Sequence, residues 1–224
     1  MIQERYRKDY DGEFIIVRTS IKNGKKYQER EWIDNPIENN YISARAVVIG
    51  SGSSRERFPI QRLQGHKGGL LGKKRLQSYG TEGCWKELQC DFYVDTVLGE
   101  HADIVEAGYS EKVPVYTDAK TCIQYPGEFY MIPYNISLTS DAALAMYIAA
   151  FDGHTEIYCV GVDGTDKMYN NKDKAIAQIE SVIKTYSKTQ FIFVNDNSNL
   201  HPSWRKQKNY SHMNYQEFVS NCDV

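Results

Sequence analysis

The sequence lacks the features of a membrane-spanning, secreted or metal-binding chain. None of its apolar runs approaches the roughly 18 residues that span a bilayer, and its start, Met-Ile-Gln-Glu-Arg, has no signal-peptide pattern. Its five cysteines form neither a Cys-x-x-Cys pair nor a ligand spacing with histidine. An odd number of scattered cysteines is typical of a reducing compartment. We therefore expect no metal site, no membrane contact and a cytoplasmic location.

The chain also lacks an excess of charge of either sign. Its 27 basic and 29 acidic residues leave a formal net charge of -2, which argues against general nucleic-acid binding through bulk electrostatics. Tyrosine, by contrast, is abundant, with 17 residues in 224. Its rigid ring and polar tip suit ligand grooves and interfaces, or a half-buried tyrosine-rich fold. A chain of this length and composition predicts one globular domain, alone or with an appendage.

The first 40 residues differ in pattern from the remainder and predict a β-hairpin arm. Residues 14–21 form a strand-like run, Asn23-Gly24 is a strong two-residue hairpin signal, and residues 26–32 can return as a second strand. The returning segment is too polar for a buried strand. We expect the arm, residues 1–40 with a linker at 34–40, either to add to the edge of the main sheet or to contact another subunit of a homo-oligomer.

The remaining residues, 41–224, alternate strands with helices. This alternation predicts a single α/β domain with a doubly wound, mainly parallel sheet. The predicted strands are residues 46–49, 69–72, 91–95, 113–117, 129–133, 156–161 and, as the last central strand, 191–194. The predicted helices are residues 58–64, 102–108, 139–151, 172–186 and 215–222.

Residues 45–55 contain the clearest sign of a ligand site. A run of branched apolar residues ends in the turn Gly50-Ser-Gly-Ser-Ser-Arg55, where glycines permit tight backbone geometry and N–H groups and hydroxyls are suited to hold an anion. The turn lacks the third glycine of a dinucleotide fingerprint and the lysine of a Walker loop. Lys73, in a basic run, either offers a charge for phosphate or belongs to a solvated surface. The turn predicts a nucleotide or phosphate site; the alternative is a strand-to-helix turn without a ligand.

Three further strand ends carry polar groups that would meet this turn. Asp95 follows one predicted strand, residues 134–137 follow another, and Asp163 follows a third. In doubly wound sheets, ligands bind outside the carboxyl ends of the strands where the strand order reverses. Asp163 can accept hydrogen bonds from ribose hydroxyls or act as a base; the alternative is a turn in which it satisfies nearby N–H groups. His154, at the opposite end of the sheet, is expected to be structural.

These motifs, in this order, resemble a known family. The turn after residue 49 resembles the Gly-x-Gly-x-Ser loop of bacterial sialyltransferases and of related Rossmann-like proteins of the 6-hydroxymethylpterin diphosphokinase-like group. The run from Ser140 to Asp163 is similar to their second motif, a small-residue helix followed by a glycine turn, a Glu-Ile-Tyr strand and a Gly-x-Asp ending. The resemblance covers about residues 43–195 and implies a Rossmann-like fold. The whole chain also looks like proteins of marine bacteriophages, which would place it in the host cytoplasm but implies no activity.

The family resemblance implies a site for a nucleotide-activated donor, a CMP-sugar or NDP-sugar, and no other cofactor. Asp163 would stand at the edge of the sugar. The family uses a histidine base well after the aspartate motif, whereas this chain has no histidine between His154 and His201. Serine also replaces the asparagine or proline of the family loop. The residues implied for the nucleotide are Gly50, Ser51, Gly52, Ser53, Ser54 and Tyr169 for the phosphate, and Tyr134, Asn135 and Ser137 for the base and ribose.

Two functional hypotheses follow. In the first, the protein is a glycosyltransferase-like enzyme whose partner is a nucleotide-type small molecule, and it transfers the activated group to a hydroxyl acceptor. Arg55 or Lys73 would offset the charge of the leaving group, while Asp163 or Asp95 would orient or deprotonate the acceptor. In the second, it is a non-catalytic virion, assembly or host-interaction protein that keeps the transferase fold and makes contacts through its arm.

Overall fold

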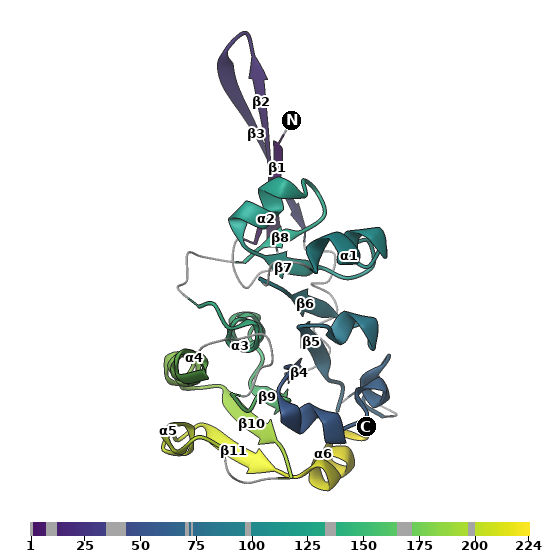
Figure 1. Ribbon diagram of the computed structural model, residues 1–224, viewed down its shortest axis with the longest axis vertical. Helices are drawn as coiled ribbons and strands as arrows, with labels where there is room; N and C mark the ends of the chain where they lie inside the picture. The colour runs from purple at the N-terminus through teal and green to yellow at the C-terminus, as the bar shows by residue number, and fades with distance from the viewer. Residues whose placement is uncertain are drawn as a thin grey trace.

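The main sheet contains eight parallel strands. The structure, a computed structural model, describes residues 2–7, 13–34, 44–69, 72, 74–96, 100–132, 138–164, 172–196 and 200–224. In these segments the strands are β4 (Arg45–Ile49), β5 (Gln77–Thr81), β6 (Phe92–Val94), β7 (Val115–Thr117), β8 (Tyr130–Met131), β9 (Glu156–Val160), β10 (Gln190–Val194) and β11 (Tyr210–Met213). Their order across the sheet is β11-β10-β9-β4-β5-β6-β7-β8 (Figure 1).

The strand order reverses between β4 and β9. The chain runs outward from β4 through β5, β6 and β7 to β8, then returns to pair β9 with the other side of β4. Both pairings of β4 are parallel, with Val48 opposite Tyr79 of β5 and opposite Cys159 of β9. The predicted doubly wound sheet is therefore confirmed. Its switch point lies at the carboxyl ends of β4 and β9, where ligands bind in such sheets.

Helices cover both faces of this sheet (Figure 1). One apolar cluster contains residues from α3 (Asp141–Phe151), α4 (Lys172–Thr185) and α5 (Pro202–Arg205). The other contains residues from α1 (His101–Glu106), α2 (Ala119–Gln124), α6 (Tyr215–Cys222) and the 3-10 helices η3 (Ile60–Leu63) and η4 (Cys84–Lys86). Strand residues alternate between the two clusters: Ala46 and Val48 belong to the first, Val47 and Ile49 to the second. This period of two is what a sheet with both faces buried requires.

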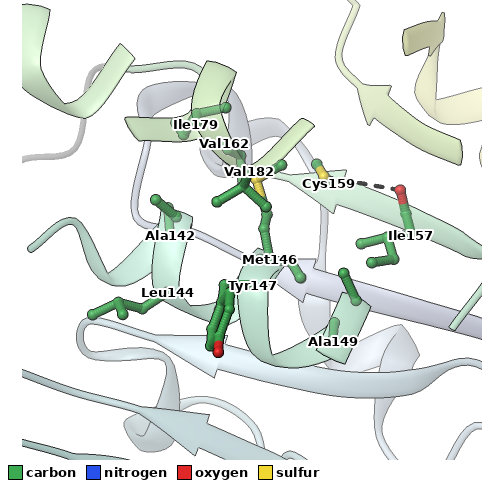
Figure 2. Packing of buried hydrophobic residues seen from close by; sticks show 14 of the residues in the cluster. Ala142, Leu144, Met146, Tyr147, Ala149, Ile157, Cys159, Val162, Ile179 and Val182 are labelled. Carbon is green, nitrogen blue, oxygen red and sulfur yellow. Dashed lines mark hydrogen bonds between the residues drawn. The ribbon is translucent and has the colours of Figure 1, made fainter. Parts of the chain in front are cut away.

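Helix α3 is the centre of the first cluster. Ser140 caps it by accepting a hydrogen bond from the N–H of Ala143 at 3.4 Å, as expected from its sequence. All eleven residues of α3 are buried, and Figure 2 shows Met146 among side chains of β9 and α4. The helix is therefore surrounded by protein, which explains why its composition is almost wholly apolar.

The hairpin arm is confirmed and extends the sheet. Strand β1 (Ile2–Arg7) pairs in parallel with β8, and antiparallel β2 (Glu13–Lys22) and β3 (Lys25–Asp34) continue beyond it. Asn23 and Gly24 both have positive φ, 52° and 74°, as the predicted two-residue turn requires. The tip projects from the body (Figure 1), and Ile21 is 75% exposed. The linker at 34–40 falls almost entirely outside the described residues, and the division at residue 40 stays a prediction.

The strand predicted at residues 69–72 is wrong at both of its ends. Gly69 and Gly72 have φ of 74° and 66°, which extended backbone does not adopt, and residues 70 and 71 lie outside the described residues. The strand in this part of the chain is β5, whose polar sequence concealed it. The prediction that 191–194 is the last central strand is confirmed: this strand is β10, which lies between β9 and β11. The edge strand β11, which pairs with β10 in parallel, was not predicted. The expectation for His154 is confirmed: it is 2% exposed, and its Nε2 lies 3.0 Å from the Tyr79 hydroxyl.

Candidate functional site

The loops that follow β4 and β9 are joined main chain to main chain. The N–H of Gly50 donates to the carbonyl of Val160 at 2.9 Å, and the N–H of Gly52 donates to the carbonyl of Gly161 at 2.8 Å. These two amides are thus satisfied inside the protein. They join the two loops at the switch point. Hydrogen-bond donors for a ligand must therefore come from the residues that follow Gly52.

Three glycines make this contact possible. A Cβ at Gly50 would lie 2.5 Å from the Gly161 carbonyl oxygen, and one at Gly52 would lie 2.3 Å from Oδ1 of Asp163. A Cβ at Gly161, whose φ is 69°, would lie 2.6 Å from the Gly50 oxygen. Real Cβ atoms do not approach other atoms so closely. The sequence predicted close approach of backbone at Gly50 and Gly52; the approach that the structure describes is between the two loops.

Asp163 holds the start of the 3-10 helix η2 (Ser53–Arg57). Its Oδ2 accepts a hydrogen bond of 2.8 Å from the N–H of Ser54. The hydroxyl of Tyr215 on α6 donates to the Ser54 carbonyl, so η2 is fixed from two sides. Asp163 is half-buried. Asp163 therefore satisfies a nearby N–H group, as one of the two interpretations of its sequence position expects. Whether it can also contact a ligand depends on the space beside its carboxylate.

A cavity lies between η2, Asp163 and the end of β10. Its volume is about 230 Å³, and its lining residues are Ser53, Ser54, Glu56, Arg57, Asp163 and Asn195. Side chains three residues apart coincide on a 3-10 helix, which places Arg57 with Ser54 on one wall. The structure thus brings together three of the predicted residues, Ser53, Ser54 and Asp163. Sequence reasoning missed Arg57 and Asn195, although the latter follows a strand adjacent to β9.

Arg55 has a different environment from the one predicted. Its Nη2 donates to Oε1 of Glu87 at 2.5 Å, and its Nη1 lies 3.5 Å from the Gly50 carbonyl. It lines a second cavity of about 550 Å³ along η2, which shares Glu56 and Arg57 with the first. The guanidinium of Arg55 is already neutralised by Glu87, so Arg57 is the arginine of the Asp163 cavity.

The Ser51 side chain contacts the residue that follows the neighbouring strand β5. Its hydroxyl donates to Oε2 of Glu82, the residue that follows β5. Burial raises the pKa of the Glu82 carboxyl, and the negative charge of Glu100 adds to this effect, while the Ser51 hydrogen bond opposes it. Ser51 therefore belongs to an acidic region beside the cavity and is not among the residues that line it.

Asp95 belongs to the same acidic region, which consists of Glu82, Asp95, Glu100 and Asp141. It is fully buried at the end of β6, and its Oδ2 is 3.7 Å from Nε2 of His101. Strand β6 is three strands from β9, which separates the two strand ends by about 14 Å at the usual strand spacing. The two aspartates predicted as catalytic therefore follow strands that are not adjacent in the sheet.

Asp141, at the start of α3, is also part of this region. Its Oδ1 accepts hydrogen bonds from the N–H and hydroxyl of Thr96 at 3.1 and 2.5 Å. Burial raises the pKa of Asp141 well above its usual range, and the neighbouring charges of Asp95 and Glu82 raise it further. The carboxyl is 1% exposed, so burial and these neighbouring charges favour its protonated form.

Five predicted residues, Lys73, Tyr134, Asn135, Ser137 and Tyr169, lie outside the described residues. In the segments that the structure does describe, no set of three or more His, Cys, Asp or Glu side chains is arranged to hold a metal ion. No helix in those same segments combines the length and apolar character needed to cross a bilayer.

Comparisons with known proteins give one distant likeness. No family model matches the chain, and no curated protein matches it. A solved structure of the sialyltransferase CstII from Campylobacter jejuni, in complex with the substrate analogue cytidine-5'-monophosphate, is similar with a TM-score of 0.45 and 15% sequence identity. The similarity covers 69% of this chain and 81% of that one. Similarity at this level assigns neither an activity nor a ligand to the present chain.

Proposed function

We propose that the protein binds a nucleotide-activated sugar at the switch point and transfers the sugar to a hydroxyl acceptor. The observation that carries this proposal is the cavity of about 230 Å³ between η2 and Asp163. It combines two serine hydroxyls and a guanidinium, which suit a phosphate, with a carboxylate, which suits a hydroxyl group. These are the two chemistries that glycosyl transfer from such a donor needs in one place.

The phosphate would contact Ser53, Ser54 and Arg57. Because Glu56 and Asp163 also line the cavity, Arg57 is the cation on which anion binding depends. As the bond between the sugar and the phosphate oxygen breaks, negative charge grows on the leaving nucleotide, and Arg57 and the hydroxyls would offset it. The side chains proposed from sequence for the base, ribose and phosphate, Tyr134, Asn135, Ser137 and Tyr169, stay part of the proposal.

Asp163 would act on the acceptor. Its Oδ2 is held by the Ser54 N–H, so the carboxylate has a fixed position at the wall of the cavity. The acceptor hydroxyl would attack the sugar carbon while its proton passes to Asp163. We assign this role to Asp163 alone, because Asp95 lies three strands away in the acidic region. Asp95 and His101 would then support that region without touching the reacting atoms.

Thermal unfolding with a panel of nucleotides tests donor binding. We expect CMP, UDP or GDP, at ten times its Kd, to raise the Tm by about 3 °C or more, and Arg57→Gln to remove the shift. Arg62→Gln is the matched control, because Arg62 is exposed on η3 and lines neither cavity. The proposal fails if no nucleotide stabilises the protein, or if the Arg57 and Arg62 variants behave alike.

A second candidate function is assembly through the arm. The exposed side chains of Ile21 and Tyr27, 75% and 50% accessible, lie on the projecting tip. Apolar side chains so exposed on an arm suit contact with a second copy. Light scattering of the wild type and of the double variant Ile21→Ser, Tyr27→Ser decides this candidate. A wild-type oligomer that becomes monomeric in the variant supports it; a monomeric wild type rejects it.

A further inference from the structure

A separate cavity opens at the opposite rim of the sheet, away from the switch point. It has a volume of about 450 Å³ and lies among the segments that lead into β5 and β6. Ser78 and Asp91, at the amino ends of these strands, form part of its wall, and the loop of residues 63–67 forms another part. A cavity of this size is within the range of small-molecule sites. None of its lining residues belongs to the switch-point cavity.

Arg75 is the residue in this wall that lacks an adequate partner. Its side chain is only 21% exposed, yet no group in the described part of the chain accepts a hydrogen bond from its guanidinium. The nearest charge is Oδ1 of Asp91, at 3.8 Å from Nη2, which is too long for a hydrogen bond. The other oxygen of Asp91 is occupied by the N–H and hydroxyl of Ser78, at 2.8 and 3.0 Å. Arg75 lines the cavity, and its guanidinium, which carries five N–H donors, is therefore available to an acceptor that a ligand supplies.

The neighbouring polar groups add positive charge and donors. Lys67 also lines the cavity, is exposed and makes no ion pair with a described residue. Gln64 uses its Oε1 to accept from the Gln89 N–H at 3.1 Å, which leaves its NH₂ group as a donor. His66 adds no charge, because its Nδ1 accepts from the Leu76 N–H at 3.3 Å and its Nε2 donates to the Cys222 carbonyl at 2.9 Å. The wall therefore offers two cations against one carboxylate.

We propose that this cavity binds a small molecule that bears an oxyanion, a carboxylate or a phosphate, on a scaffold of about the size of a hexose. Arginine presents a planar fork of N–H donors that matches both kinds of oxyanion with two parallel hydrogen bonds. Arg75 supplies this fork, Lys67 supplies long-range attraction, and the Gln64 amide and the Ser78 region suit the hydroxyls of the scaffold. The site is independent of the proposed transfer reaction.

Calorimetric titration with three matched hexoses tests the proposal. Glucuronate carries a carboxylate, glucose 6-phosphate carries a phosphate, and glucose carries neither; all are titrated at constant ionic strength. We expect glucuronate or glucose 6-phosphate to bind and glucose not to bind, and the anion that binds identifies the oxyanion. Absence of binding by both anions, or equal binding of glucose, overturns the proposal.

Variants assign the binding to this cavity. Arg75→Gln should weaken it about tenfold or more, because both the charge and the fork are lost, whereas Arg75→Lys should lose less because it retains the charge. Arg62→Gln and the switch-point variant Arg57→Gln should bind like the wild type. Equal affinity in Arg75→Gln and wild type would show that the anion binds elsewhere. If Arg75→Gln does not fold, Lys67→Gln replaces it. A smaller loss of affinity is expected, because only the long-range attraction of one cation is removed, and an affinity equal to that of the wild type would again show that the anion binds elsewhere.

Discussion

At the scale of single residues, the switch point depends on the absence of side chains at a few positions. Gly52 has φ -61° and ψ 153°, a conformation that any residue adopts, so the backbone does not require glycine there. What requires it is the space taken by Asp163. The glycine therefore positions the carboxylate that we propose to act on the acceptor.

Replacing Gly52 by alanine should lower both stability and ligand binding. The new methyl group would lie 2.3 Å from Oδ1 of Asp163, and displacing such a contact costs about 1–3 kcal/mol. Gly65→Ala is the control, since nothing lies within 4 Å of its Cβ position and only its φ of +60° is unfavourable. Urea unfolding and nucleotide titration of both variants measure the effect. Loss of nucleotide binding in Gly65→Ala, or its retention in Gly52→Ala, would contradict this account.

Asp163→Asn should separate binding from transfer. Asparagine keeps an oxygen that can accept from the Ser54 N–H, so η2 and its phosphate contacts should persist. Loss of the base should lower kcat by about 10²- to 10⁴-fold with donor affinity changed only a few-fold. Steady-state transfer assays and nucleotide titration of the same variant measure the two effects. A variant with unchanged kcat would exclude Asp163 as the base.

Asp141→Asn should change the dependence of stability on pH. Because the folded-state pKa of Asp141 is raised, wild-type stability is greatest where this carboxyl is protonated, below its unfolded pKa, and declines as the pH rises from there toward the folded pKa. Asparagine removes the decline. Relative to wild type, the variant should therefore be more stable at pH 8 than at pH 4. Urea unfolding from pH 4 to pH 8 measures this dependence, with Asp103→Asn, at an exposed position, as the control. The same dependence of stability on pH in both variants would contradict the prediction.

At the scale of secondary-structure elements, the arm and the body should respond to mutation differently. Strands β2 and β3 pair along ten residues each, but residues 21–29 at the tip are exposed. Their order thus depends on the turn and on each other. The body, by contrast, derives its order from two apolar clusters that enclose the sheet.

Gly24→Val should unfold the tip of the arm and leave the body intact. A β-branched residue at φ 74° costs about 1–2 kcal/mol, and the turn at Asn23-Gly24 sets the register of both strands. Hydrogen exchange should accelerate in residues 18–29 while the global Tm stays within about 1 °C, since the tip contributes little to the core. A large fall in Tm would show that the arm is part of the cooperative unit.

Sequence patterns predicted those elements whose burial is visible in their own residues. The runs that became β4, β9 and β10 are apolar, and α3 has its cap and apolar composition in sequence. Strand β5, Gln77–Thr81, is wholly buried yet mostly polar, because its burial comes from neighbouring strands and from the approach of Cys90 to Gly80. Strand β11 is half-exposed at the edge, so its pattern is weak.

The same reasoning applies to the candidate site. Ser53, Ser54 and Asp163 could be predicted because they directly follow buried strands. Arg57 could not be predicted, since its place beside Ser54 depends on η2 being a 3-10 helix. Arg55 was proposed as a phosphate ligand because its pairing with Glu87, 32 residues away in sequence, could not be foreseen. Long-range pairing of this kind is not visible in local patterns.

At the scale of the whole molecule, the body should unfold as one unit. Phe193 is 1% exposed and stacks with Trp204 and Tyr210, with ring centroids 5.1 and 5.3 Å apart. Truncation of a buried phenylalanine costs about 3–5 kcal/mol. Phe193→Ala should therefore shift the unfolding transition equally when it is followed by tyrosine fluorescence and by circular dichroism. Separate transitions for the two probes would indicate independent subdomains.

The close main-chain contact between the loops of Gly50 and Gly161 also affects how ligand specificity can change. Main-chain atoms make this joint, so the base of the switch-point cavity has the same shape whichever side chains surround it. Replacement of Ser53, Arg57 or Asn195 would alter the chemistry of the walls without disturbing their foundation. Descendants of such a scaffold can exchange one ligand for another by altering a handful of wall residues, while both glycines stay unchanged.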